Sequence, residues 1–148
     1  RLAQRLAKRM CSCKQGYVPE PAELTSFLRE YCDELLNTPR FKADPKGAME
    51  AVYKDWVRHC GNDRGQLTFY KPVGCDKCGG TGMKGRCGLH ELLIATDRLK
   101  KLIQEHARVA EILAVCLEEG MRTLKQDGME KCLTGVTHIK EVRSVCIK

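Results

Sequence analysis

The chain has 148 residues, of which 43% are hydrophobic and 30% are charged, and it carries a formal net charge of +7. This composition is typical of a globular protein and excludes a collagen-like, fibrous or low-complexity chain. No apolar run approaches the roughly 20 residues that a membrane-spanning helix needs. Because the first residue is Arg1 and no signal-peptide pattern follows it, we expect a piece of a longer soluble protein, with one domain or two small ones.

Residues 2–10 show a helical spacing of apolar side chains. Leu2, Leu6 and Met10 fall on one helical face, with basic residues beside them. This pattern predicts the end of a helix. A knuckle-like turn begins at Cys11.

Residues 20–65 contain two amphipathic stretches that together predict a helical hairpin. The first stretch predicts a helix over 22–36, followed by a loop over 37–43. Asp44 and Pro45 then provide an N-cap and a first helical residue for the second helix. The two apolar stripes are wide enough to pack against each other and to form a small core of their own. The stripes consist of Leu24, Phe27, Leu28, Tyr31 and Leu35, and of Met49, Val52, Tyr53, Trp56 and Val57.

The next segment predicts two strands separated by a glycine-rich loop. Residues 66–73 and 86–93 have the character of strands. Residues 74–88 are so rich in glycine that regular structure is not expected unless a cross-link orders them. A bound metal would provide such a cross-link.

Residues 96–148 are predicted to form about four short helices, the first capped by Thr96 or Asp97 and the last by Thr137. The predicted fold class is therefore mainly α with a small β element. We assign a tetracysteine zinc-knuckle subdomain to 1–95, with the helical-hairpin insert at 20–65, and a C-terminal helical subdomain to 96–148.

The ten cysteines fall into two groups. Several lie in helix-like stretches beside Leu or Val, as the packed thiols of a cytosolic protein do. The pairs Cys11/Cys13 and Cys75/Cys78 instead lie in turn-rich, basic segments, where close pairs favour metal over disulfide. Zn²⁺ takes four soft ligands in a tetrahedron, and two such turns supply two each. We therefore predict that these four cysteines bind one structural Zn²⁺.

The first cysteine pair is shorter than is usual for zinc ligands, because a single residue separates Cys11 from Cys13. Cys87 is the expected substitute if either of them is not a ligand. Cys60 belongs to a helical stripe, and we expect it in the core. The alternative interpretation is that the close pairs are reduced thiols in loops.

The two cysteine pairs coincide with the excess positive charge. Residues 1–13 have a net charge of +4 and residues 71–96 a net charge of +2. Four thiolates on Zn²⁺ make a site of formal charge −2, which basic neighbours stabilise. No nucleic-acid partner is expected, because aromatic residues for base stacking are not interleaved with the basic ones.

The sequence shows no catalytic or cofactor-binding residues. The string most similar to a phosphate-binding loop, Gly80 to Arg86, lacks the Lys and the hydroxyl that hold phosphates and Mg²⁺. The four histidines are scattered along the chain and are expected at the surface or at helix caps. We therefore expect that this chain by itself is not an enzyme and does not hydrolyse ATP.

Five stretches, in order along the chain, carry motifs of one known family: Ala3 to Lys14, Tyr70 to Arg86, Gly88 to Leu93, Gly120 to Gly128, and Gly135 to Thr137. They resemble the type II secretion ATPase E and type IV pilus assembly ATPase family, in the portion downstream of its Walker motifs. The resemblance covers 1–14 and about 66–148. There are departures: the first cysteine pair is one residue short, Met83 replaces an aromatic residue, and Cys87 stands where many members carry Thr or Val.

This resemblance implies a C-terminal zinc-binding and helical appendage of a hexameric ATPase that powers protein export or pilus assembly. ATP and Mg²⁺ would bind upstream of Arg1 in the parent protein, and this portion would be non-catalytic. Its implied partners are neighbouring ATPase subunits and an inner-membrane platform protein. The implied location is cytoplasmic, at the inner face of the bacterial inner membrane, which the protein would reach through its partners.

Two other functions remain open from the sequence. A free-standing zinc module that binds nucleic acid would show tight, salt-sensitive binding to DNA or RNA. A metal-free regulatory domain would use its cysteines only as packed thiols, and metal analysis distinguishes it from the ATPase appendage.

Overall fold

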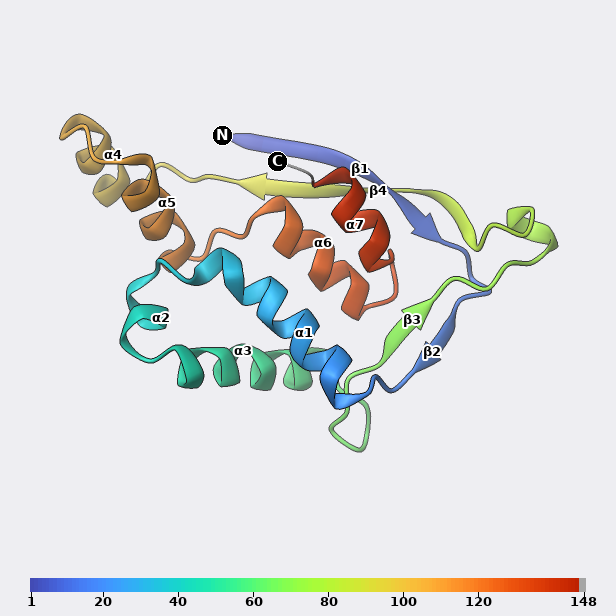
Figure 1. Ribbon diagram of the computed structural model, residues 1–148. Helices are drawn as coiled ribbons and strands as arrows, with labels where there is room; N and C mark the ends of the chain where they lie inside the picture. The colour runs from blue at the N-terminus through green and yellow to red at the C-terminus, as the bar shows by residue number, and fades with distance from the viewer. Residues whose placement is uncertain (147–148) are drawn as a thin grey trace.

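The computed structural model describes residues 1–146 and shows most helices on one side of a long β-ribbon (Figure 1). The long ribbon consists of β1 (Leu2–Met10) and β4 (Met83–Leu92), which run antiparallel. A shorter antiparallel ribbon consists of β2 (Gln15–Tyr17) and β3 (Phe69–Lys71). Because each sheet has only two strands, both depend on what packs against them.

Helices make up most of the regular structure in residues 1–146, which confirms the mainly α fold with a small β element. The helices are α1 (Pro21–Cys32), α2 (Pro39–Ala43), α3 (Pro45–Cys60), α4 (Asp97–Gln104), α5 (Val109–Glu118), α6 (Leu124–Leu133) and α7 (Ile139–Val145), and a 3₁₀ turn (Asp33–Leu35) extends α1. In this part of the chain, none of the helices has the length and apolar character needed to cross a membrane.

Strand β1 replaces the helix end predicted for residues 2–10, so that prediction is wrong. The leucines at positions 2 and 6 are four residues apart, a spacing that suits one face of a helix and one face of a strand equally well. Residue-by-residue pairing with β4, which begins with Leu2 opposite Leu92, decides between the two. Ala7 is buried on the inner face of the strand, whereas Leu2 and Leu6 remain more than half exposed.

Two predicted helix caps are confirmed, and one predicted loop is wrong. Asp44 caps α3, because its Oδ1 accepts a hydrogen bond from the Gly47 N–H at 3.1 Å. Thr96 caps α4 through its hydroxyl oxygen, which accepts from the Leu99 N–H at 3.2 Å. The predicted loop over 37–43 contains the short helix α2, because Pro39 provides a favourable first helical residue.

Thr137 is not the cap of the last helix, contrary to the prediction. His138 is the N-cap of α7, and its Nδ1 accepts from the Lys140 N–H at 3.2 Å. Thr137 is almost completely buried, and its hydroxyl donates to the Lys8 carbonyl oxygen of β1 at 2.8 Å. A buried hydroxyl needs a partner, and here it finds one in the strand rather than in its own helix.

A single apolar cluster joins α1 and α3 to the C-terminal helices. The rings of Tyr31 and Trp56 lie 4.9 Å apart, centroid to centroid, and link α1 to α3. Their cluster also contains Met129 of α6 and Val142 of α7, both fully buried. The two helices therefore share a core with the end of the chain and do not form a satellite core of their own. The boundary between subdomains at residues 95 and 96 remains a prediction.

A polar cluster ties α1, α6 and α7 together at the edge of this core. Both carboxylate oxygens of Glu30 in α1 accept from Arg143 in α7, the shortest contact being 2.6 Å from Nη2, and Oε2 lies 3.0 Å from the Lys125 ammonium of α6. The Glu30 side chain is only 17% exposed. Hydrogen bonds from Arg143, opposed by partial burial and reinforced by Lys125, hold the pKa of Glu30 below its ordinary value of 4.5.

We predict that Trp56→Ala lowers the free energy of unfolding by about 3–5 kcal/mol, because it leaves a cavity in the shared core. Urea unfolding followed by circular dichroism measures the change. Leu36→Ala is the matched control: Leu36 is 51% exposed, and its truncation should have little effect. Equal effects of the two substitutions would contradict the described core.

We predict that Glu30→Gln lowers the free energy of unfolding at pH 7 by about 1.5–3 kcal/mol, the range for hydrogen bonds to charged groups. A carboxylate whose pKa is lowered in the folded state stabilises the fold above its unfolded pKa. That contribution is lost as the pH falls from about 4.5 through the lower folded value. The difference between wild type and variant should therefore shrink toward pH 3.

Urea unfolding at a series of pH values tests this prediction. Glu50→Gln is the control, because Glu50 forms only an exposed ion pair with Lys54 in α3. At pH 7, an equal loss in the free energy of unfolding for Glu30→Gln and Glu50→Gln would contradict the prediction. A loss for Glu30→Gln that grows as the pH falls would also contradict it.

Candidate metal centre

The four cysteines predicted as ligands come together in one cluster. The two segments that carry them, between β1 and β2 and between β3 and β4, join the long ribbon to the short one (Figure 1). Cys11 and Cys13 lie in the turn between β1 and β2. Cys75 and Cys78 lie in the segment between β3 and β4. Cys75 is the N-cap, and Cys78 the last residue, of a one-turn 3₁₀ helix (Asp76–Cys78). All four sulfur atoms lie within 4.8 Å of one another.

The distances between the sulfurs suit a tetrahedral metal site. The Sγ atoms of Cys11 and Cys75 are 3.7 Å apart, as are those of Cys75 and Cys78, and those of Cys13 and Cys78 are 4.0 Å apart. A tetrahedron with Zn–S bonds of about 2.3 Å has sulfur–sulfur edges of about 3.8 Å. A disulfide, at about 2.05 Å, is much shorter, and all ten cysteines are free. The cluster can therefore hold a metal ion, while the ligand role of each cysteine remains a prediction.

Backbone N–H groups point at the sulfurs from the second loop. The N–H groups of Cys75 and Gly82 each donate to the Cys78 Sγ at 3.2 Å. The Cys11 N–H in turn donates to the Gly82 carbonyl oxygen at 2.9 Å, which links the two loops directly. Donors aimed at sulfur favour the thiolate, the form of cysteine that binds metal.

Glycine is required at two positions of this loop. Gly74 has φ of +112°, and a Cβ there would lie 2.6 Å from the Gly80 carbonyl oxygen. Gly82 has φ of +77°, and a Cβ there would lie 2.5 Å from Pro72. The glycines that made this segment look irregular thus allow it to fold tightly around the sulfurs.

The sulfurs differ in how readily they ionise. A backbone hydrogen bond from Cys13 lowers the pKa of Cys11. Burial raises the pKa of Cys78, but the N–H groups of Cys75 and Gly82 outweigh it and bring that pKa down to about 6. A backbone hydrogen bond from Gly74 favours the Cys13 thiolate, yet burial and the three neighbouring sulfurs together raise the pKa of Cys13 to about 11. The Cys13 thiol is therefore held in its neutral form more strongly than those of Cys11 and Cys78, and a bound cation would favour its thiolate.

The short Cys11–Cys13 pair reaches the cluster because the chain turns sharply there. The Lys14 N–H donates to the Cys11 carbonyl oxygen at 3.0 Å and closes the turn. Cys87, the expected substitute, lies outside the cluster and is buried with Ala7 in a small apolar group on the inner face of the long ribbon. Cys60 packs against the main core, as predicted.

The excess positive charge surrounds this part of the fold. Residues 1–14 and 71–96 together carry a formal net charge of +7, equal to that of the whole chain, and they form the long ribbon and both cysteine loops. In residues 1–146, no ion pair with a carboxylate forms from Arg1, Arg5, Lys8 or Arg86.

Sequence reasoning missed the residues that attach the cysteine loops to the C-terminal helices. The Lys14 Nζ donates to the Gly135 carbonyl oxygen at 2.7 Å, and the Met10 N–H donates to the Val136 carbonyl oxygen at 2.9 Å. A lysine directly after a cysteine pair gives no signal of such a contact. Gly135 follows the end of α6 with φ of +76°, but its role as the acceptor for Lys14 depends on tertiary packing.

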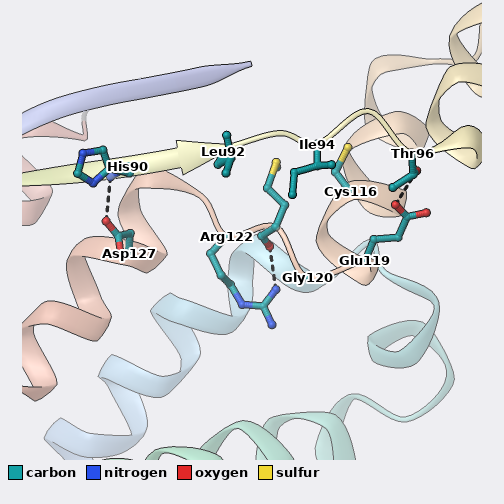
Figure 2. Close-up of a pocket in the computed structure, with 10 residues that line it drawn as sticks. His90, Leu92, Ile94, Thr96, Cys116, Glu119, Gly120, Arg122 and Asp127 are labelled. Atoms are coloured by element: carbon teal, nitrogen blue, oxygen red, sulfur yellow. Dashed lines mark hydrogen bonds between the residues drawn. The ribbon is translucent and has the colours of Figure 1, made fainter.

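A separate pocket of about 360 Å³ lies between the end of β4, α5 and the start of α6 (Figure 2). Its polar groups are paired with one another: Thr96 donates to Glu119 at 2.8 Å, and the His90 N–H donates to Asp127 at 2.8 Å. Cys116, buried in its wall, has a pKa raised by burial. These lining residues do not present a nucleophile beside a base, so the pocket does not suggest catalysis.

Comparison with known proteins finds matches over almost the whole chain. A family model described as type II/IV secretion system protein matches residues 2–144. The chain is 32% identical over 142 residues to the type IV pilus assembly ATPase PilB of Thermus thermophilus, covering 95% of this chain and 13% of that protein. It is also 32% identical over 146 residues to PilB of Acinetobacter baylyi, covering 97% and 20%.

A shorter match links the chain to type II secretion. The chain is 41% identical over 75 residues to the type II secretion system protein E of Dickeya dadantii, a match that covers 51% of this chain and 15% of that protein. In these three comparisons the matched part spans between 13% and 20% of the relatives' length.

Proposed function

Because the chain belongs to the type II/IV secretion system protein family, we propose that it is the C-terminal zinc-binding and helical part of a hexameric ATPase. That ATPase would power protein export or pilus assembly from the cytoplasmic face of the bacterial inner membrane. The relatives named as pilus assembly ATPases support this proposal, since almost the whole chain matches a small part of each.

The tetracysteine cluster is the observation that carries the proposal. Cys11, Cys13, Cys75 and Cys78 would hold one Zn²⁺, and the sulfur spacing of 3.7–4.0 Å and the N–H donors to Cys78 support this. A structural Zn²⁺ contributes folding free energy by cross-linking loops that have little core of their own. Here it would fasten the ends of both ribbons at one point.

The role of this part would be contact rather than catalysis. The 148 residues contain no phosphate-binding loop motif, so ATP and Mg²⁺ would bind to other parts of the parent protein. The outer face of the long ribbon carries Leu2, Leu6 and Leu92, each more than half exposed. Such a face supports contacts with neighbouring ATPase subunits or with a platform protein of the inner membrane.

We predict about one Zn²⁺ per chain in protein purified without chelator, measured by elemental analysis. Cys75→Ser should abolish zinc binding and raise amide hydrogen exchange in residues 74–88 more than in α6, which is held by the apolar core. Cys87→Ser is the matched control, because Cys87 lies outside the sulfur cluster, and it should keep its zinc. A near-zero zinc content in the wild type, or equal zinc loss in both variants, would overturn the metal assignment.

We predict that the 148-residue chain alone does not hydrolyse ATP, because it lacks the loop that binds phosphates. Release of phosphate from ATP and Mg²⁺ should equal that of buffer. Turnover that co-purifies with the chain through successive columns would contradict the non-catalytic role while leaving the metal assignment intact.

A further inference from the structure

One short segment of the chain contacts both the sulfur cluster and the C-terminal helices. Within residues 8–14, Cys11 and Cys13 contribute sulfurs to the cluster. The residues around them bind the turn that connects α6 to α7. The hydrogen bonds are Met10 N–H to the Val136 carbonyl oxygen at 2.9 Å, Thr137 hydroxyl to the Lys8 carbonyl oxygen at 2.8 Å, and Lys8 N–H to Glu141 Oε1 at 2.9 Å.

Lys14, which directly follows Cys13, adds a side-chain contact to the same turn. Its Nζ donates to the Gly135 carbonyl oxygen at 2.7 Å, and it lies 5.2 Å from the centroid of the Tyr70 ring, within cation–π range. The charge is therefore satisfied by a carbonyl and by an aromatic face. Because the hydrogen bond is partly buried, it contributes more than an exposed one would.

Gly135 is shaped to receive this lysine. Its φ is +76°, a conformation that favours glycine. A Cβ at this position would lie 2.9 Å from the Lys14 Nζ and 3.1 Å from Cδ2 of Tyr70. The absence of a side chain thus serves two needs: the turn that ends α6 and the close approach of Lys14.

The direction of the Lys14 side chain depends on the same turn that positions the sulfurs. The Lys14 N–H donates to the Cys11 carbonyl oxygen, so the turn from Cys11 to Lys14 fixes the sulfurs and the lysine together. We propose that Lys14 is a positioning residue that couples the metal centre to the α6–α7 turn, so that metal binding orders α7. This inference rests on the proposed zinc site.

The coupling follows from what each partner can do alone. Without a metal ion, the two loops are joined by the hydrogen bond from the Cys11 N–H to the Gly82 carbonyl oxygen and by contacts between sulfurs. The turn that presents Lys14 is then held less firmly, and with it the contact to the Gly135 carbonyl oxygen. The helix α7 (Ile139–Val145) has seven residues, too few to be stable by itself. It therefore relies on contacts with other elements: Val142 in the core, the ion pair of Arg143 with Glu30 of α1, and the hydrogen bonds to residues 8–14.

Hydrogen exchange on the full chain tests the coupling, with the zinc content of every sample measured in parallel. Three proteins are compared, each with bound metal and after removal of metal by chelator: wild type, Lys14→Met and Lys84→Met. Methionine keeps the length of the side chain and removes its charge. Lys84 is an exposed lysine of β4, close in sequence to the second cysteine pair, and serves as the matched control.

In the wild type, metal removal should speed exchange of amides 135–145 by roughly tenfold, the change expected for partial local opening. Lys14→Met should keep its zinc but show this fast exchange with zinc still bound, and chelation should then add little. Lys84→Met should behave as the wild type does. This pattern separates a positioning role from a ligand role, since the zinc content does not change.

Four results would overturn the coupling. If amides 135–145 of zinc-bound Lys14→Met exchange at the wild-type rate, the lysine does not position the turn. Metal removal that affects 74–88 but not 135–145 in the wild type would leave the zinc site standing and remove the coupling. Loss of zinc from Lys14→Met would show that Lys14 acts on metal binding and not on the position of the α6–α7 turn. Absence of zinc from the wild type would remove both the proposed site and this inference.

Discussion

Four cysteine sulfurs meet at one point and bring the ends of both ribbons together. Within residues 1–146, each of these narrow ribbons has two strands. Two-stranded sheets are only marginally stable without support. The inner face of the long ribbon gains support from buried Ala7, Cys87 and Leu89, but the loops at its far end have only the sulfur cluster and a few hydrogen bonds. A metal ion at that cluster would replace the apolar core that these loops lack.

The core stabilises the other half of the molecule and explains why the helices between the two cysteine pairs do not stand apart. Tyr31 and Trp56 pack against each other, and their cluster includes Met129 and Val142 near the end of the chain. Glu30 adds a partly buried carboxylate shared by Arg143 and Lys125. Segments more than 100 residues apart in sequence are thus held together by both apolar and ionic contacts. The cysteine loops and the helical core meet at the α6–α7 turn.

Much of this arrangement could be predicted from the sequence where a local signal was strong. The 3.6-residue period gave α1 and α3, and Asp44 gave the start of α3. The four cysteines were found from the spacing of each pair and their basic, turn-rich surroundings, and the structure brings them together. These signals are local, so they do not depend on knowing which distant segments meet.

The predictions that are wrong concern residues whose structure is decided by distant partners. Leu2 and Leu6 fit a helix and a strand equally well, and only pairing with β4 selects the strand. Thr137 has the chemistry of a helix cap, but its hydroxyl bonds to a carbonyl of β1, 129 residues away in sequence. Lys14 and Gly135 showed no pattern that would have connected them. Tertiary hydrogen bonds of this kind leave no periodic trace in a single sequence.

X-ray absorption spectroscopy at the zinc edge tests the tetracysteine site, because it reports the atoms bound to the metal. We expect four sulfur scatterers at about 2.3 Å and no nitrogen or oxygen in the first coordination sphere. Fewer than four sulfurs, or a histidine nitrogen or water oxygen at about 2.0–2.1 Å, would contradict the tetracysteine site.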